Sequence, residues 1–409
     1  MQQRTASDRR IILILGMLMT ISPFAIDMYL PAFGQIADEM GTSATRISLS
    51  VASYFVGLAV GQLMYGPLLD RFGRKKPLYI GLSLFMVASL GCMQSGTVTE
   101  LVTFRFFQAL GGCVAWVAAA TMVRDFFPVK EASRIFSLLI LVLGLSPLVA
   151  PTAGGFVAVA LGWRAIFLIL LVLTGLVMAV VILFLPAGRE PDKAVDLRPL
   201  PMLRTYLSIL REPQFVTFTL AGSRAFAALF TYVSGSPVIF MELYGLEPQH
   251  YGILFAVISV GFIGASQLNI LLTRYFRPDR IFSTVLPVQA VIGMLFVGVA
   301  FMGHPPVWLT ILFIFLTMAC IGMLNPNASA LALAPFTRNI GSASAMAGFT
   351  QITLASVVSS VVGNFDSATL LPFAILMGAS SLAGLFVLVT GKRFIKTMVT
   401  GETDGAAAH

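Results

Sequence analysis

Long apolar stretches separated by short polar ones fill this chain almost from end to end. A helix needs about 20 mostly apolar residues to span the hydrocarbon core of a bilayer, and twelve stretches are long enough. We expect spans at Ile11–Phe33, Ile47–Leu68, Leu78–Gln94, Leu101–Val123, Ile135–Leu161, Ala165–Leu185, Phe215–Phe240, Tyr251–Leu272, Ile281–Met302, Val307–Leu333, Ser342–Val362 and Leu371–Thr390. The pattern predicts an all-α membrane protein with twelve transmembrane helices. Only 11% of the residues are charged, against about 25% in soluble proteins.

The basic residues divide unevenly between the two sets of connections that alternate along the chain. One set holds 22 of the 26 Lys and Arg residues, whereas the other holds only Arg46 and Arg164. The positive-inside rule then places both termini in the cytoplasm. The net charge of +8 therefore reflects membrane topology, and no basic stretch interleaved with aromatic residues points to nucleic acid.

The longest polar interruption, Pro186–Arg211, follows the sixth predicted span and divides the chain into two halves. Leu68–Arg74 and Leu271–Arg277 share the pattern L-L-x-R-aromatic-x-R at the equivalent place in each half. We expect two pseudo-symmetric six-helix bundles that face a central cavity. Their predicted bounds are 1–188 and 213–400, with a cytoplasmic linker over 189–212 and a disordered tail over 401–409.

Asp27 and Arg105 are charges inside predicted spans, where a charge needs a partner or water. At about 1.5 Å per residue, both lie roughly 6–10 Å below the outer ends of their helices. A nearby Arg would favour the charged carboxylate, whereas burial would favour the neutral form. The two residues therefore predict a carboxyl group that loads and releases a proton. A static ion pair that joins two helices is the alternative.

Four sets of residues resemble a known family. Gly66–Pro77, with the sequence GPLLDRFGRKKP, resembles the signature between helices two and three of the major facilitator superfamily. Arg105 within Phe104–Gly111 resembles a motif of its twelve-helix drug:proton antiporters, as do five residues of the fifth span, namely Gly144, Pro147, Pro151, Gly154 and Gly155. Asp27–Pro31 and Gly162–Arg164 are most similar to the Bcr/CflA subfamily of drug-resistance transporters.

This resemblance implies the major facilitator fold and a multi-pass protein of the bacterial cytoplasmic (inner) membrane. It implies a proton-coupled antiporter that exports small amphipathic drugs or toxic compounds by alternating access, with Asp27 as proton site and Arg105 as its partner. In the family, the fifth-span motif limits leak, although bending and packing explain its residues nearly as well. The family's gating motif, which holds helix two against helix eleven, corresponds here to Gly66, Asp70, Arg71, Gly73 and Arg74.

We expect Gly66 and Gly73 to allow tight turns in the gating motif, and topology alone is the alternative role for its charges. Gln108, Gly112 and Trp116 follow Arg105 along one helical face and form a candidate substrate wall, although Trp116 also suits packing. The other candidate substrate-binding residues are Tyr29, Arg224, Phe230 and Gln351. Arg224 lies near mid-membrane, where it faces a cavity or serves structure.

Enzyme signatures are missing from the sequence. Cys92, Cys113 and Cys320 are scattered through apolar spans, with neither metal-ligand spacing nor an evident disulfide pairing. Without a phosphate loop, the energy source should be an ion gradient rather than ATP. We expect no cofactor and no metal, and a monomer whose partners are a small-molecule substrate, protons and the bilayer. One alternative is an exporter or importer of one metabolite, such as a nucleobase, amino acid derivative or siderophore; another is a channel or membrane enzyme.

Overall fold

The computed structural model describes residues 6–127, 129–186, 188, 191, 206–336, 340–364 and 369–399. The chain divides into two compact units, which we describe separately. Unit 1 comprises Met1–Leu197 and Leu246–Ala256, and unit 2 comprises Arg198–Gly245 and Val257–His409. The described residues are almost entirely helical, which confirms the predicted all-α class.

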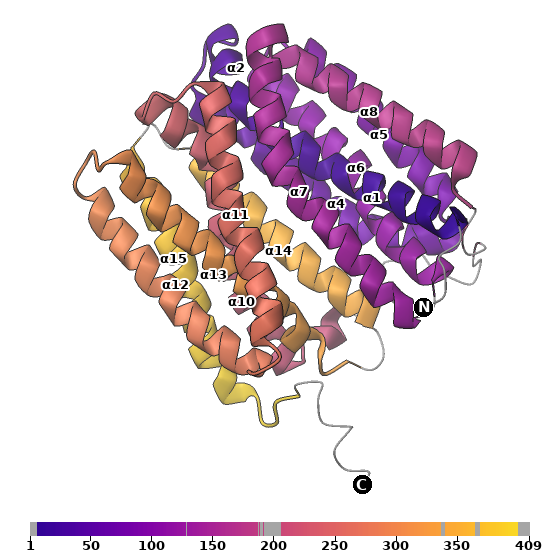
Figure 1. The fold of residues 1–409 in the computed structure, drawn as a ribbon, viewed down its shortest axis with the longest axis vertical. Helices are drawn as coiled ribbons and strands as arrows, with labels where there is room; N and C mark the ends of the chain where they lie inside the picture. The colour runs from indigo at the N-terminus through magenta and orange to yellow at the C-terminus, as the bar shows by residue number, and fades with distance from the viewer. Residues whose placement is uncertain are drawn as a thin grey trace. The chain divides into compact units, whose positions relative to one another are not determined.

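Unit 1 is built on α6, against which both α4 and α5 pack (Figure 1). The first helix, α1, contacts α6, α7 and α8. The elements of unit 1 are α1 (Ala6–Asp27), η1 (Leu30–Ala32), α2 (Phe33–Glu39), α3 (Ala44–Ile47), α4 (Leu49–Phe72), α5 (Lys75–Gln94), α6 (Val98–Phe126), α7 (Val129–Leu161) and α8 (Trp163–Phe184). The first turns of α11 (Pro248–Leu272) also belong to this unit.

Unit 2 is arranged around α10, which packs against α13, α14 and α15. Its elements are α10 (Pro213–Pro237), the π-helical η2 (Val238–Leu243), the rest of α11, α12 (Pro278–Ala300), α13 (Val307–Leu333), α14 (Ile340–Val362), α15 (Leu370–Gly391) and η3 (Lys392–Phe394). The predicted seventh span therefore changes from α-helix to π-helix after Pro237.

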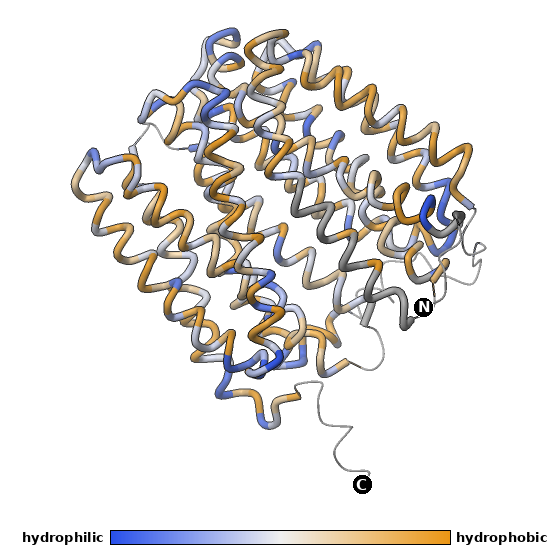
Figure 2. The backbone as a smooth tube through the Cα atoms, in the orientation of Figure 1, coloured by the Kyte–Doolittle hydropathy of each residue, from blue (hydrophilic) through white to orange (hydrophobic). Residues whose placement is uncertain are grey.

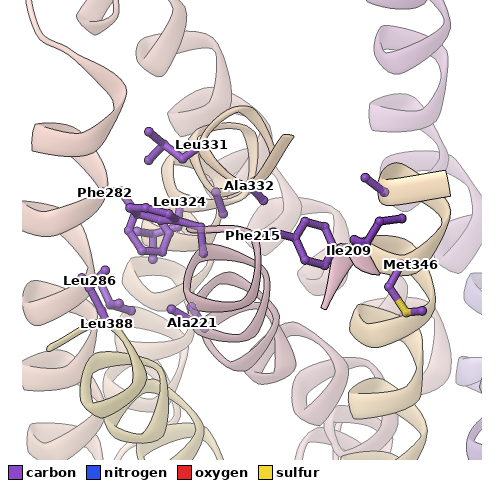
Figure 3. Packing of buried hydrophobic residues seen from close by; sticks show 14 of the residues in the cluster. Ile209, Phe215, Ala221, Phe282, Leu286, Leu324, Leu331, Ala332, Met346 and Leu388 are labelled. Atoms are coloured by element: carbon purple, nitrogen blue, oxygen red, sulfur yellow. The ribbon is translucent and has the colours of Figure 1, made fainter. Parts of the chain in front are cut away.

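An apolar core holds the helices of unit 2 together (Figure 3). Phe215 and Phe218 of α10 are fully buried, and the ring of Phe218 meets that of Phe282 of α12 edge to face, with centroids 5.5 Å apart. Edge-to-face contact suits the charge distribution of aromatic rings. Leu324 and Leu331 of α13 and Leu388 of α15 complete the same cluster.

Eleven helical segments among the described residues are long and apolar enough to cross a membrane. The fifth predicted span falls in α7 and is not among these eleven. Its last part, Ser146–Leu161, is a shorter apolar helical segment. Hydrophobic residues run along most of each helix, and hydrophilic residues gather towards helix ends and connections (Figure 2). Large apolar side chains such as Leu183 and Phe386 are exposed, as expected of a surface that contacts lipid.

The first predicted span is broken rather than continuous. α1 ends at Asp27, and the chain passes through a turn and the short helix η1 before α2 begins at Phe33. Pro31 explains this break, because proline lacks the N–H that would bond to the carbonyl four residues earlier and its ring clashes with that carbonyl. The residue four before Pro31 is Asp27 itself. The acid expected within a regular helix therefore lies at a helix end.

Candidate functional site at the break in the first helix

Arg105 of α6 binds the last turn of α1. Its Nη1 atom donates a hydrogen bond to the backbone carbonyl oxygen of Ala25 (3.0 Å). The last four carbonyls of a helix have no partner within it and carry partial negative charge, so a cation is well placed there. Ala25 lies two residues before Asp27. Arg105 thus stabilises the interrupted helix next to its acid.

The guanidinium of Arg105 is fully enclosed by unit 1. Its Cζ atom lies over the rings of Tyr29 (4.6 Å to the centroid) and Tyr54 of α4 (4.3 Å). Both rings are buried, and cation–π attraction strengthens when a cation loses its water. Arg105 also donates to Gln108 Oε1 (2.7 Å), whose Nε2 donates to Ser89 of α5 (2.8 Å). Four helices therefore contribute to holding this one charge.

Asp27 is buried, with only 7% of its surface exposed. In the part of the chain that the structure describes, no ion pair joins it to Arg105. Arg105 instead reaches α1 through the backbone of Ala25, and its role as the partner of Asp27 stays a prediction. The interruption of α1 explains this contact, because the last carbonyl groups of α1 lack the N–H partners that a continuing helix would supply.

Tyr29, Gln108 and Gly112 belong to the interior of unit 1 and are not exposed to a ligand in this structure. Tyr29 is fully buried, and its hydroxyl lies 2.9 Å from that of Ser50. Gln108 is also fully buried, and a Cβ on Gly112 would lie 2.9 Å from Ser22 Oγ. The substrate roles of these three residues therefore stay predictions, which would require a conformation that exposes them. Trp116 is 38% exposed, so its role as a substrate residue stays a prediction.

Two adjacent glycines of α7 make close backbone contacts within unit 1. A Cβ on Gly154 would overlap the backbone of Met28, which directly follows Asp27. A Cβ on Gly155 would lie 2.5 Å from the carbonyl oxygen of Pro248, at the start of α11. Both positions therefore require glycine for packing. Pro147 and Pro151 lie inside the same continuous helix. Gly144 is also within α7, but its surroundings lie outside the described residues.

The motif between α4 and α5 forms a charge cluster with the end of α6. Arg74 donates from Nη1 to Asp70 Oδ1 (2.6 Å) and from Nε to Asp125 Oδ2 (2.7 Å). Burial lowers the pKa of the Arg74 guanidinium, but its hydrogen bonds to Asp125 and Asp70 outweigh this effect and raise the pKa overall. Gly73 ends α4 with φ of 80°, which confirms the predicted turn.

Gly66 departs from the expected turn. It lies inside α4 with Pro67 next to it, and a Cβ there would meet open space. The predicted tight turn at Gly66 is therefore wrong, since the helix continues through it to Phe72. Arg71 lies in the last turn of the same helix.

The predicted substrate residues of unit 2 are partly accessible. Arg224 is half-buried in α10, with its Cβ beside Gly384 of α15, and among the described residues it has neither an ion-pair nor a hydrogen-bond partner. The ring of Phe230 packs against that of Phe226 (5.3 Å between centroids). Gln351 of α14 donates to Asn325 of α13 (3.0 Å). These contacts leave the substrate roles of Arg224, Phe230 and Gln351 as predictions.

Two acids that bind residues of the predicted motifs were not predicted from the sequence. Asp125 joins the gating motif from 51 residues away, without any local signal. Glu39, at the end of α2, accepts hydrogen bonds from Trp163 Nε1 and Arg164 Nη1 (both 2.7 Å). Glu39 therefore explains the Gly162–Arg164 motif, in which Gly162 has φ of 81°. The only signal was that Arg164 is one of two basic residues on its side of the membrane.

Cys92, Cys113 and Cys320 are free. All three are buried in helices of the two units.

Comparison with known proteins agrees with the fold and its motifs. The chain is 32% identical over 375 residues to an MFS-type transporter of Bacillus subtilis, with 91% of this chain and 92% of the relative covered. It is 28% identical to a bicyclomycin resistance protein homolog of Haemophilus influenzae, with 90% and 92% covered. It is 29% identical to multidrug resistance protein D of Escherichia coli, with 86% and 88% covered.

Solved structures show the same fold at lower identity. The structure of a D-xylose–proton symporter matches with a TM-score of 0.74 at 16% identity, covering 96% of this chain and 98% of that one. A bacterial homolog of the lysosomal transporter Spinster matches with a TM-score of 0.70 at 14% identity, covering 96% and 97%. Residues 15–360 match the Major Facilitator Superfamily. The chain therefore belongs to the Major Facilitator Superfamily as a multi-pass membrane transporter, among relatives of the Bcr/CflA type.

Proposed function

We propose that this transporter exports small amphipathic drugs or toxic compounds in exchange for protons, with Asp27 as the proton site. The observation that carries the proposal is a buried acid at the point where a membrane helix is interrupted. Interrupted helices place unpaired backbone groups and polar side chains at membrane depth, where ions bind in other transporters. The names of the relatives, bicyclomycin resistance protein homolog and multidrug resistance protein D, support drug efflux.

Asp27 can couple proton exchange to a change of conformation, because its charge and its access to water change together. A buried carboxylate without a partner is costly, whereas a neutral carboxyl group tolerates an apolar site. A conformation that wets Asp27 favours release of the proton, and one that encloses it favours the protonated form. Arg105 acts as a positioning residue, since it fixes the last turn of α1 through Ala25. The Asp27 carboxyl is thereby held at a defined place.

The gating role of the charge cluster belongs to the same proposal. Arg74, Asp70 and Asp125 tie the ends of α4, α5 and α6 together inside unit 1. Asp70 keeps half of its side chain exposed, so it is available for a second contact in another conformation. We place this cluster and both termini on the cytoplasmic side of the bacterial inner membrane, as the distribution of basic residues favours.

Proton exchange is tested in everted membrane vesicles that contain the protein. Addition of a transported drug should dissipate a preformed proton gradient with wild-type protein and leave it unchanged with Asp27→Asn. Drug-induced proton release that persists in the variant would exclude Asp27 as the proton site. The drug is chosen from a susceptibility panel on a strain that overexpresses the transporter.

A transporter dedicated to one metabolite is the second candidate function. Arg224 favours it, because a half-buried cation in the middle of α10 suits an anionic or zwitterionic substrate better than a lipophilic cation. Resistance to many unrelated compounds that is unaffected by Arg224→Ala would exclude this candidate. The single-metabolite transporter would be favoured over multidrug export by two results together. The strain would show resistance to none of the compounds, and one nutrient would change its growth only while Arg224 is present.

A further inference from the structure

Among the buried polar atoms of unit 1 that have no hydrogen-bond partner in the described residues, four belong to Arg105 and its neighbours. They are Arg105 Nε, Arg105 Nη2, the Tyr54 hydroxyl and the Ser22 hydroxyl. Arg105 and Tyr54 are fully buried, and Ser22 is 9% exposed. Buried polar groups in folded proteins are nearly always paired with protein or with ordered water. A fully buried cation with two unused N–H groups therefore points to a further ligand.

The four atoms belong to one cluster. The Cζ atom of Arg105 lies 4.3 Å from the centroid of the Tyr54 ring. The Tyr54 hydroxyl approaches Ser22, but neither oxygen forms a well-aligned hydrogen bond with the other. Ser22 in turn lies against Gly112 of α6, where a Cβ would be only 2.9 Å from its oxygen. Residues of three helices, α1, α4 and α6, thus bring these polar atoms near one another.

We propose that bound water occupies this region and bridges Arg105, Tyr54 and Ser22. The guanidinium has only donors, so its free N–H groups require an acceptor. Water supplies two acceptor and two donor positions, and it can therefore accept from Arg105 and donate to either hydroxyl oxygen. Because Gly112 has no side chain, the Ser22 oxygen can lie only 2.9 Å from the place that a Cβ would take. Unit 1 then contains an internal hydration site behind the break in α1.

The site gives Tyr54 and Ser22 a role that sequence motifs did not assign to them. They hold the water that completes the coordination of Arg105, while Ala25 and Gln108 fill its other positions. This inference concerns hydration alone and does not depend on proton coupling. Failure of Asp27 as a proton site would leave it intact.

X-ray hydroxyl-radical footprinting of the purified full-length protein in nanodiscs tests the proposal. Radicals formed from bound water modify neighbouring side chains even where bulk solvent has no access. After normalisation to intrinsic reactivity, Tyr54 should be modified several-fold faster than Phe218 and Phe282, which are equally buried in the apolar core of unit 2. Phe282 is seen in that core in Figure 3. Modification of Tyr54 at the rate of these two controls would overturn the proposal.

A second measurement identifies the source of the oxygen that is added to Tyr54 and the species that occupies the site beside Arg105. Rapid mixing into H₂¹⁸O should place the heavy isotope on Tyr54 more slowly than on exposed side chains, because the bound water must first exchange with bulk water. The result should be the same in chloride and in gluconate buffer. Modification of Tyr54 only after removal of chloride would show that a halide fills the site, and the assignment to water would be wrong.

Discussion

Arg105 donates a hydrogen bond to the backbone carbonyl of Ala25, and so connects α6 to the end of α1 two residues before Asp27. A backbone contact fixes the path of the chain regardless of the charge on Asp27. If Asp27 exchanges a proton, as we propose, this contact can persist in both charge states of the acid, which a direct ion pair could not do. On that proposal, Asp27 carries the proton and Arg105 holds the end of α1 in place.

Arg105→Lys should impair transport although it keeps the positive charge. Arg105 binds Ala25 and Gln108 through a single planar guanidinium that also lies on two tyrosine rings. An ammonium group has neither the planar geometry nor the reach to replace these contacts together. We expect drug-driven proton release in everted vesicles to fall strongly. Wild-type rates with Lys would show that charge alone suffices, and that the geometry is unimportant.

Asp27→Asn should abolish proton-coupled efflux and preserve the fold. The amide has nearly the shape of the carboxyl group but cannot release a proton at physiological pH. Measurements of drug resistance and drug-driven proton release should both fall to the level of the empty vector, while binding of the drug persists. Glu242→Gln, at the end of η2, is the matched control. Loss of coupling in Glu242→Gln, with normal coupling in Asp27→Asn, would move the proton site to Glu242.

Asp125→Asn and Asp70→Asn should separate stability from gating. Asp125 has 11% of its side chain exposed and Asp70 has 50%, although both bind Arg74. A hydrogen bond to a charged, buried group contributes about 1.5–3 kcal/mol, whereas an exposed ion pair contributes about 0–1 kcal/mol. Thermal unfolding in detergent should therefore show a clear loss for Asp125→Asn and little for Asp70→Asn.

If Asp70 also stabilises a closed cytoplasmic side, Asp70→Asn should increase labelling of cysteines introduced at the cytoplasmic mouth. Unchanged labelling with normal transport would exclude the gating role. The positive-inside explanation of this loop would then be sufficient.

The sequence predicts the spans well and the directions of polar side chains poorly, for a physical reason. A bilayer requires long apolar helices, so their number and places are visible in composition alone. The substrate wall expected of Gln108, Gly112 and Trp116 rests on their spacing along one helix, and spacing alone does not show which neighbours that face meets. Pro31 signals the interruption of the first helix, since its fourth predecessor is Asp27. The contact of Arg74 with Asp125 has no such signal, because it depends on how α4, α5 and α6 pack.

Gly154→Ala should be poorly tolerated and Gly66→Ala should be harmless. A methyl group at position 154 would overlap the Met28 backbone and push on the end of α1, whereas one at position 66 meets open space in α4. Alanine in an unstrained helical position stabilises by about 0.4–1 kcal/mol through the unfolded state. We expect lower thermal stability and lost coupling for Gly154→Ala, and an unchanged or raised melting temperature for Gly66→Ala. Equal behaviour of the two variants would contradict the packing role of Gly154.

Gln214→Ala should destabilise unit 2 by releasing its C-terminal segment. The buried Gln214 amide donates to the carbonyls of Leu331 (2.8 Å) and Val399 (2.7 Å), and accepts from the Val399 N–H (3.0 Å). The substitution leaves these backbone groups without their partner, at about 1–3 kcal/mol for each group that stays buried. Thermal unfolding followed by size-exclusion chromatography should show a lower melting temperature. Gln35→Ala, which removes one half-buried hydrogen bond to Ala158 in unit 1, should cost less. A Gln214→Ala protein as stable as the Gln35→Ala control would show that the C-terminal segment is held by its apolar contacts instead.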